Sequence, residues 1–160
     1  MNLPSLVLWG FVATLVMSTV LSASQGLGFS RMSLPFILGT IFTPDRNKAP
    51  VAGFVVHLLG GWGFAVIYGL VFEALGRATW WLGVLAGAVH GFVVLVVFLP
   101  LLPGFHPRMA SEHQGPEPTH ALEPPGFLGL NYGRRTPLIA FLAHLAYGAI
   151  LGGFYELSRT

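Results

Sequence analysis

Four long apolar runs alternate along the chain with stretches that hold nearly all of its charged residues. Each run has roughly the 20 residues that an α-helix needs to cross the apolar core of a bilayer. Lys, Arg and Asp are absent from the interior of all four runs. The pattern therefore predicts an all-α integral membrane protein with four transmembrane helices. We expect these helices to cover residues 3–23, 51–72, 80–102 and 137–157.

The second and fourth runs carry the same residues around a histidine, which indicates an internal duplication. Phe, Leu, Gly and Tyr stand at positions −3, +1, +4 and +11 from both His57 and His144. We interpret the chain as a single membrane domain of two tandem parallel two-helix repeats, residues 1–76 and 77–160. Each repeat has an even number of spans, so both insert the same way up, and a twofold axis along the membrane normal relates them. His57 and His144 should then lie at matched depth.

Small residues recur at about every fourth position along the predicted spans. In lipid the hydrophobic effect does not drive helices together, so close approach of backbones over small residues does much of the packing. His57 and His144 each interrupt such a ridge and should therefore point into a helix interface. Residues 93–99, a run of large apolar side chains, are expected to face lipid. The predicted packing glycines are Gly53, Gly61, Gly69, Gly83, Gly87, Gly148 and Gly152.

Composition agrees with this class of protein. Hydrophobic residues make up 54% of the chain and charged residues 9%, against roughly a quarter charged in soluble domains. Cysteine is absent from the sequence, which excludes disulfides and thiolate ligands. The composition therefore excludes an ordinary soluble domain. Because there is no cysteine, the sequence gives no indication of the redox compartment.

Basic residues set the expected orientation, because Lys and Arg near span ends are retained in the cytoplasm. They are concentrated in the connections 24–50 and 103–136. We therefore place both long connections in the cytoplasm and both termini outside it. The basic charge then reflects loop retention, and no nucleic-acid partner is expected. Membrane lipid headgroups or a partner subunit are the expected contacts of Arg46, Arg134 and Arg135.

The two connections share short motifs that are more typical of loop anchoring than of catalysis. The apolar run 34–42 is too short to span, and it should lie in the interface or fold back as a short helix. Residues 103–136 are rich in proline and are expected to form an extended loop. The shared motifs are Arg31-Met32 with Arg108-Met109, and Leu38-Gly39-x-x-Phe42 with Leu128-Gly129-x-x-Tyr132.

Ionisable residues inside a span are costly and indicate function by default. One interpretation of His57 and His144 is structural, with neutral imidazoles that join two helices by hydrogen bonds. A second makes them the axial ligands of a b-type haem, with neighbouring glycines leaving a slot for the macrocycle. A third adds His90 and places a metal ion among the three. A relay of protons or substrate through the same histidines would instead make the protein a small transporter or channel.

Other polar residues support plainer interpretations. Glu73 lies at a span end, where an ion pair with the nearby Arg77 is expected. His106, His113 and His120 are spaced by seven residues, but prolines between the last two prevent the helix that would align them on a zinc ion. Motifs for a nucleophile elbow, a phosphate loop or a zinc protease do not occur in the sequence. An enzyme is therefore disfavoured.

Residues 28–40, GFSRMSLPFILGT, followed by FTPDR at 42–46, resemble a family of small uncharacterised bacterial inner-membrane proteins with about four spans. The likeness extends over most of the chain. It implies a multi-pass location in the bacterial inner membrane and transfers no functional residues. Together with the motifs above, it favours a non-enzymatic accessory protein or subunit of a membrane complex, with the histidine pair as its candidate haem or metal site.

Overall fold

The computed structural model describes residues 1–111 and 122–158, and over these residues it is helical, without named strands. Four helices are long and apolar enough to cross a membrane, which confirms the four predicted spans. The third span, Trp80–Phe105, is a continuous helix with a π-helical turn inside it. The elements are α1 (Leu3–Gly26), α2 (Leu34–Phe42), α3 (Ala49–Leu75), α4 (Trp80–Val93), η1 (Val94–Phe98), α5 (Leu99–Phe105), η2 (Phe127–Tyr132) and α6 (Thr136–Phe154).

Local sequence explains where the spans begin and end. Pro4, Pro50 and Pro137 stand in the first turns of α1, α3 and α6, where the missing N–H leaves no hydrogen bond unmade. The Asn2 side chain caps α1 by accepting a hydrogen bond from the backbone of the first turn. Gly76 ends α3 in the left-handed conformation, at φ 64°, which glycine adopts without strain.

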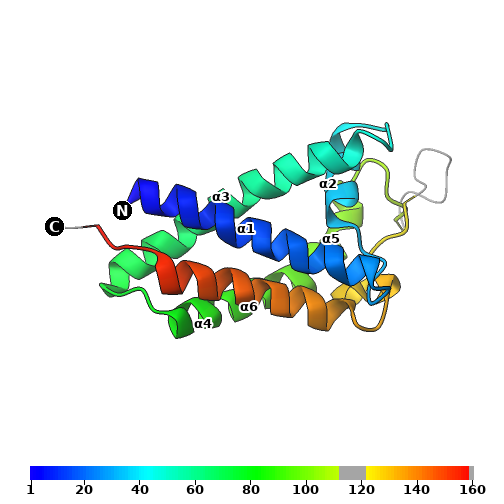
Figure 1. Cartoon of the computed structure of the whole chain (residues 1–160). Helices are drawn as coiled ribbons and strands as arrows, with labels where there is room; N and C mark the ends of the chain where they lie inside the picture. The colour runs from blue at the N-terminus through cyan, green and yellow to red at the C-terminus, as the bar shows by residue number, and fades with distance from the viewer. Residues whose placement is uncertain (112–121, 159–160) are drawn as a thin grey trace.

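The four spans pack in a row rather than as a closed square. α1 lies against α3 on one side and α6 on the other, and α6 packs along α4. α3 and α4 do not pack closely along their length. Both termini lie at the opposite end, as an even number of spans requires (Figure 1). This arrangement leaves the α3 and α4 side of the bundle open.

Glycines bring the backbones of α4 and α6 into contact. A Cβ atom at Gly83 would overlap the carbonyl oxygen of Gly148, and a Cβ at Gly148 would overlap that of Gly83. Gly87 lies in the same way against the carbonyl oxygen of His144. Gly152 packs on the backbone at the start of α4. Such contacts supply the close van der Waals packing that holds helices together in lipid.

The α1 and α3 pair is built from a similar ridge with larger side chains. Gly61 packs against the side chain of Thr14, and Gly69 also faces α1. Gly53 differs from the other predicted packing glycines, because it lies against the backbone of Pro35 in α2 rather than against another span. The apolar run 34–42 thus forms the short helix that the sequence allowed, and α3 holds it in place.

The third span departs from a regular α-helix at η1. The turn ends where the Leu99 N–H bonds the carbonyl of Val94, directly before Pro100, which has no N–H to donate. The expectation that residues 93–99 face lipid is therefore only partly right. Leu95 and Leu99 are buried in the bundle, whereas Phe98 is exposed.

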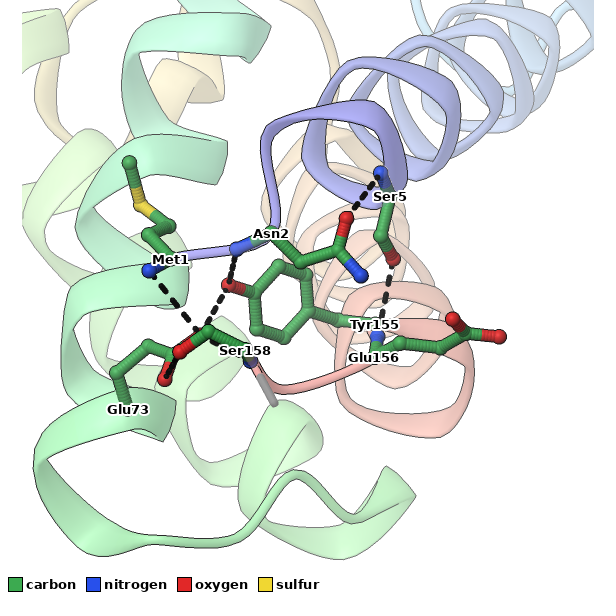
Figure 2. A network of polar contacts seen from close by, with 7 residues as sticks. All are labelled: Met1, Asn2, Ser5, Glu73, Tyr155, Glu156 and Ser158. Carbon is green, nitrogen blue, oxygen red and sulfur yellow. Dashed lines mark hydrogen bonds and ion pairs between the residues drawn. The ribbon is translucent and has the colours of Figure 1, made fainter. Parts of the chain in front are cut away.

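A polar network joins the ends of α1, α3 and α6 beside the termini (Figure 2). The Glu73 carboxylate accepts hydrogen bonds from the Tyr155 hydroxyl at 2.7 Å and the Ser158 hydroxyl at 2.6 Å, and it lies 3.7 Å from the N-terminal ammonium group. The expected ion pair with Arg77 is wrong. The Arg77 guanidinium lies over the ring of Trp81 instead, 5.6 Å from its centroid.

Replacing Gly148 by Ala should destabilise the bundle by about 1–3 kcal/mol, because the added methyl group meets the backbone of α4. Gly63→Ala is the matched control, since a Cβ there meets open space. It should be neutral or stabilise by up to about 1 kcal/mol through helix propensity. The free energy of unfolding, measured by titration with sodium dodecyl sulfate in mixed micelles, checks both. Equal effects of the two substitutions would contradict close α4 and α6 packing.

Candidate functional site

A cavity of about 260 Å³ lies in the middle of the bundle, and all three histidines of the spans line it. α1, α2, α3, α6 and the span formed by α4, η1 and α5 all contribute to its wall. The rest of the lining is largely apolar, with Met17, Leu21, Leu38 and Val94 among its side chains. An apolar cavity with a few polar groups that converge on it has the composition of a ligand site.

His144 is buried, with 4% of its surface exposed, and its ring orientation is fixed locally. Gly91 of α4 lies against its Cβ atom, where a larger residue would push the side chain away. The ring Nδ1 is 2.7 Å from the carbonyl oxygen of Ala140. A carbonyl oxygen only accepts, so Nδ1 must carry the proton. The other nitrogen, Nε2, is then an unprotonated lone-pair donor.

His57 also carries its proton on Nδ1, but a serine side chain and not a backbone carbonyl accepts the hydrogen bond. Its Nδ1 lies 3.0 Å from the hydroxyl oxygen of Ser18 on α1. That hydroxyl has one proton, which it donates to the Thr14 carbonyl oxygen at 2.8 Å. The Ser18 oxygen therefore accepts a hydrogen bond from His57 Nδ1–H. We conclude that His57, like His144, presents a bare Nε2.

His90 joins the two by ring contacts. Its ring stacks on Phe64 of α3 with centroids 3.8 Å apart, and its Nδ1 lies 3.4 Å from the Tyr68 hydroxyl. The rings of His90 and His144 meet edge to face at 4.7 Å. Nearby, the Tyr147 hydroxyl donates to the Gly61 carbonyl oxygen at 2.6 Å. These side chains connect α3, α4 and α6.

Among the described residues, none offers a hydrogen bond to Nε2 of His57, His90 or His144. The same part of the chain contains no group of three or more His, Cys, Asp or Glu side chains placed to hold a metal ion. The predicted metal site at these three histidines therefore has no support from the arrangement. What the cavity offers is a pair of matched imidazoles, with a third ring beside one of them.

His106 serves a separate purpose at the end opposite the termini. It is buried, its Nε2 lies 2.9 Å from the Ile37 carbonyl oxygen, and its Nδ1 accepts a hydrogen bond from the Arg108 N–H at 3.1 Å. The Arg108 guanidinium donates to the carbonyl oxygen of Thr40. Nε2 thus anchors α2, Nδ1 is used by the chain that follows α5, and neither nitrogen is free to bind zinc. The other histidines of that spacing, 113 and 120, lie outside the described residues.

The ends of the segment 103–136 are more ordered than the predicted extended loop. Residues 103–105 continue α5, and Met109 and Tyr132 are buried. Of the three arginines predicted to contact lipid or a partner, Arg46 and Arg135 lie over phenylalanine rings, and Arg134 is exposed. The contact of these arginines with lipid headgroups or a partner subunit stays a prediction.

Comparison with models of protein families, with curated proteins and with solved structures gave no match. Sequence reasoning identified the three histidines but missed Ser18, which fixes the tautomer of His57. It also gave no role to Tyr68, although its spacing from His57 was part of the repeated pattern.

Protonation of His106 should lower the free energy of unfolding. Burial, with the nearby Arg108 charge, holds the pKa of His106 below its ordinary value of 6.5. The unfolded chain then binds this proton more readily than the folded one, so stability is full above about pH 6.5 and falls as the pH drops below it. Thermal unfolding between pH 7.5 and 5.5 should show the loss, and His106→Gln should reduce it. An identical pH dependence in the variant would refute this role.

Proposed function

We propose that the protein is a non-enzymatic subunit of a bacterial inner-membrane complex that holds a b-type haem between His57 and His144. The observation that carries the proposal is the matched state of the two imidazoles. Each uses its Nδ1 proton within the protein, and each presents a bare Nε2 to the same apolar cavity. Histidines that ligate iron are oriented in this way, with the second ring nitrogen donating to a fixed protein group.

Haem suits the number of ligands better than a bare metal ion does. The macrocycle supplies four nitrogens of its own, so the protein needs to supply only two axial ligands. A bare ion would need three or four protein ligands, and the described residues bring no such group together. Gly60 and Gly61 of α3 line the cavity beside His57. A bound haem would give the protein one-electron redox chemistry.

The packing inside each hairpin supports an internal duplication, which would place His57 and His144 at equivalent positions. Three contacts between α1 and α3 recur, with the same four-residue steps, between α4 and α6. In each hairpin the third contact joins the histidine to a small residue on the preceding span. The pairs are Gly10 with Ala65, Thr14 with Gly61 and Ser18 with His57, against Gly83 with Gly152, Gly87 with Gly148 and Gly91 with His144.

The connections exchange a second set of matched contacts. Arg31 donates to the carbonyl oxygen of Asn131, and Arg108 donates to that of Ile41 at 3.3 Å. Asn131 and Ile41 stand at the same place in the repeated Leu-Gly-x-x-aromatic motif. Each half thus reaches across to the other half, as two parallel copies related by a twofold axis would. In the bacterial inner membrane these basic connections would face the cytoplasm, with both termini outside.

Transport through a histidine relay is the less well supported alternative. Polar side chains lead from His57 past His144 and His90 to Tyr68. The next side chain toward the termini is Phe72, which is 1% exposed and whose ring lies 6.1 Å from those of both Tyr68 and Tyr155. The polar path is broken at that apolar ring, so the geometry favours a held ligand over a translocated one.

Purified protein supplied with haem should bind it in a 1:1 ratio and show the sharp Soret and α bands of a low-spin b-type haem. His57→Ala and His144→Ala should each lose the low-spin spectrum, because each removes one axial ligand. His90→Ala is the control that separates the proposed pair from the third ring, and it should keep the spectrum. Metal analysis on the same samples should find iron only in the haem-bound form.

A wild-type protein that gives no Soret band after haem addition would contradict the proposal. So would loss of the low-spin spectrum in His90→Ala together with its retention in His57→Ala. Circular dichroism of each variant shows whether the helices are intact, so that a failure to fold is not mistaken for a lost ligand.

A further inference from the structure

The end of α1 and the start of α6 lie side by side at the end of the bundle opposite the termini (Figure 1). Two hydrogen bonds hold the adjoining segments, residues 27–31 and 130–138, together. The hydroxyl oxygens of Ser30 and Thr136 are both buried and 2.8 Å apart. The Arg31 N–H donates to the carbonyl oxygen of Tyr132 at 2.7 Å. Because α1 and α6 are both candidate spans, this α1–α6 junction lies where the two helices leave the hydrocarbon.

Two adjacent arginines at the α1–α6 junction have no acidic partner. Arg134 and Arg135 are exposed, and among the described residues neither forms an ion pair with a carboxylate. Arg135 lies over the ring of Phe29, with the guanidinium carbon 5.0 Å from the ring centroid. The ring covers one face of the guanidinium. The N–H groups around its edge stay available for an oxyanion, which a guanidinium binds through two parallel hydrogen bonds.

The other exposed cations at this end of the bundle have acidic neighbours. The Arg31 guanidinium lies 3.5 Å from the Glu123 carboxylate, and the Lys48 ammonium group lies 3.5 Å from that of Asp45. Arg46 directly follows Asp45 in the chain. Exposed positive charge without a neighbouring carboxylate is therefore concentrated at the α1–α6 junction.

The same junction exposes large apolar side chains. Leu27, just after α1, is 69% exposed, and Leu138, in the first turn of α6, is 60% exposed. Phe29 and Leu130 are exposed as well. A free inorganic anion would leave this apolar surface unused. An anionic phospholipid has both complementary parts, since its phosphodiester suits the guanidinium groups and its acyl chains suit the leucines.

We propose that the α1–α6 junction is a binding site for one anionic phospholipid. Arg134 and Arg135 bind its phosphodiester, and its acyl chains lie along Leu27 and Leu138. Of the three arginines expected to contact headgroups, this site uses two and leaves out Arg46. A headgroup with net negative charge is favoured over a zwitterionic one, because the two arginines repel the cationic group of the latter. The site does not depend on any ligand in the central cavity.

A titration of the detergent-purified protein with phosphatidylglycerol, followed by native mass spectrometry, tests the site. The wild type should bind one phosphatidylglycerol about tenfold or more tightly than phosphatidylcholine with the same acyl chains. Arg134→Gln and Arg135→Gln should each weaken phosphatidylglycerol about fivefold, and the double variant about 25-fold, because each cation beside an anionic lipid contributes a factor of this size. Arg46→Gln is the matched control, since Arg46 also lies over a phenylalanine ring, and it should bind like the wild type.

Equal affinity of the wild type for the two lipids would overturn the proposal, as would an Arg46→Gln variant that loses as much affinity as the double variant. Inorganic phosphate separates a lipid site from a free-anion site. Phosphate that displaces phosphatidylglycerol at concentrations similar to those at which the lipid binds would also overturn it.

Thermal unfolding supplies a second readout and checks the fold of each variant. A ligand that binds only the folded state raises the melting temperature. Phosphatidylglycerol should therefore raise the melting temperature of the wild type and of Arg46→Gln more than phosphatidylcholine does, and this difference should vanish in the double variant. A double variant that melts like the wild type in detergent alone and keeps the full difference between the lipids would contradict the site.

Discussion

The close approach of helix backbones inside each hairpin is the constraint on which the site depends. Along α4 and α6 the glycine contacts leave no room for side chains between the two backbones. His144 is therefore held by its own carbonyl against Gly87 and by its Cβ against Gly91. Its imidazole therefore points away from the α4 backbone and into the cavity. A weaker contact would let the ring turn, and the orientation of its Nε2 would no longer be defined.

Hydrogen bonding inside the apolar bundle then decides what the histidines can do. A buried polar atom without a partner is costly, so the Nδ1 protons of His57 and His144 are given to groups already at hand. Ser18 and the Ala140 carbonyl are both acceptors for this purpose. The result is two neutral rings with the same free atom, which suits a Lewis acid such as haem iron. A ligand that offers only carbonyl oxygens would find no donor at either ring.

Much of the fold could be predicted because it depends on local sequence. Hydropathy alone gives the four spans, and the prolines at 50 and 137 mark the starts of α3 and α6. The partners of Glu73 and His106 could not be predicted, since Ser158 and Ile37 are far from them in sequence. The open side of the bundle at α3 and α4 could not be predicted either, because it depends on which spans fail to pack. Three histidines could be named, but their tautomers follow from tertiary contacts.

We propose that His57 and His144 ligate the same iron atom. Low-temperature electron paramagnetic resonance of the ferric haem-loaded protein tests it most directly, because two neutral imidazoles give a low-spin signal distinct from that of one imidazole and water. We expect this low-spin signal in the wild type and a high-spin signal once either histidine is replaced. A high-spin wild type, or a low-spin signal that persists without His57, would contradict it.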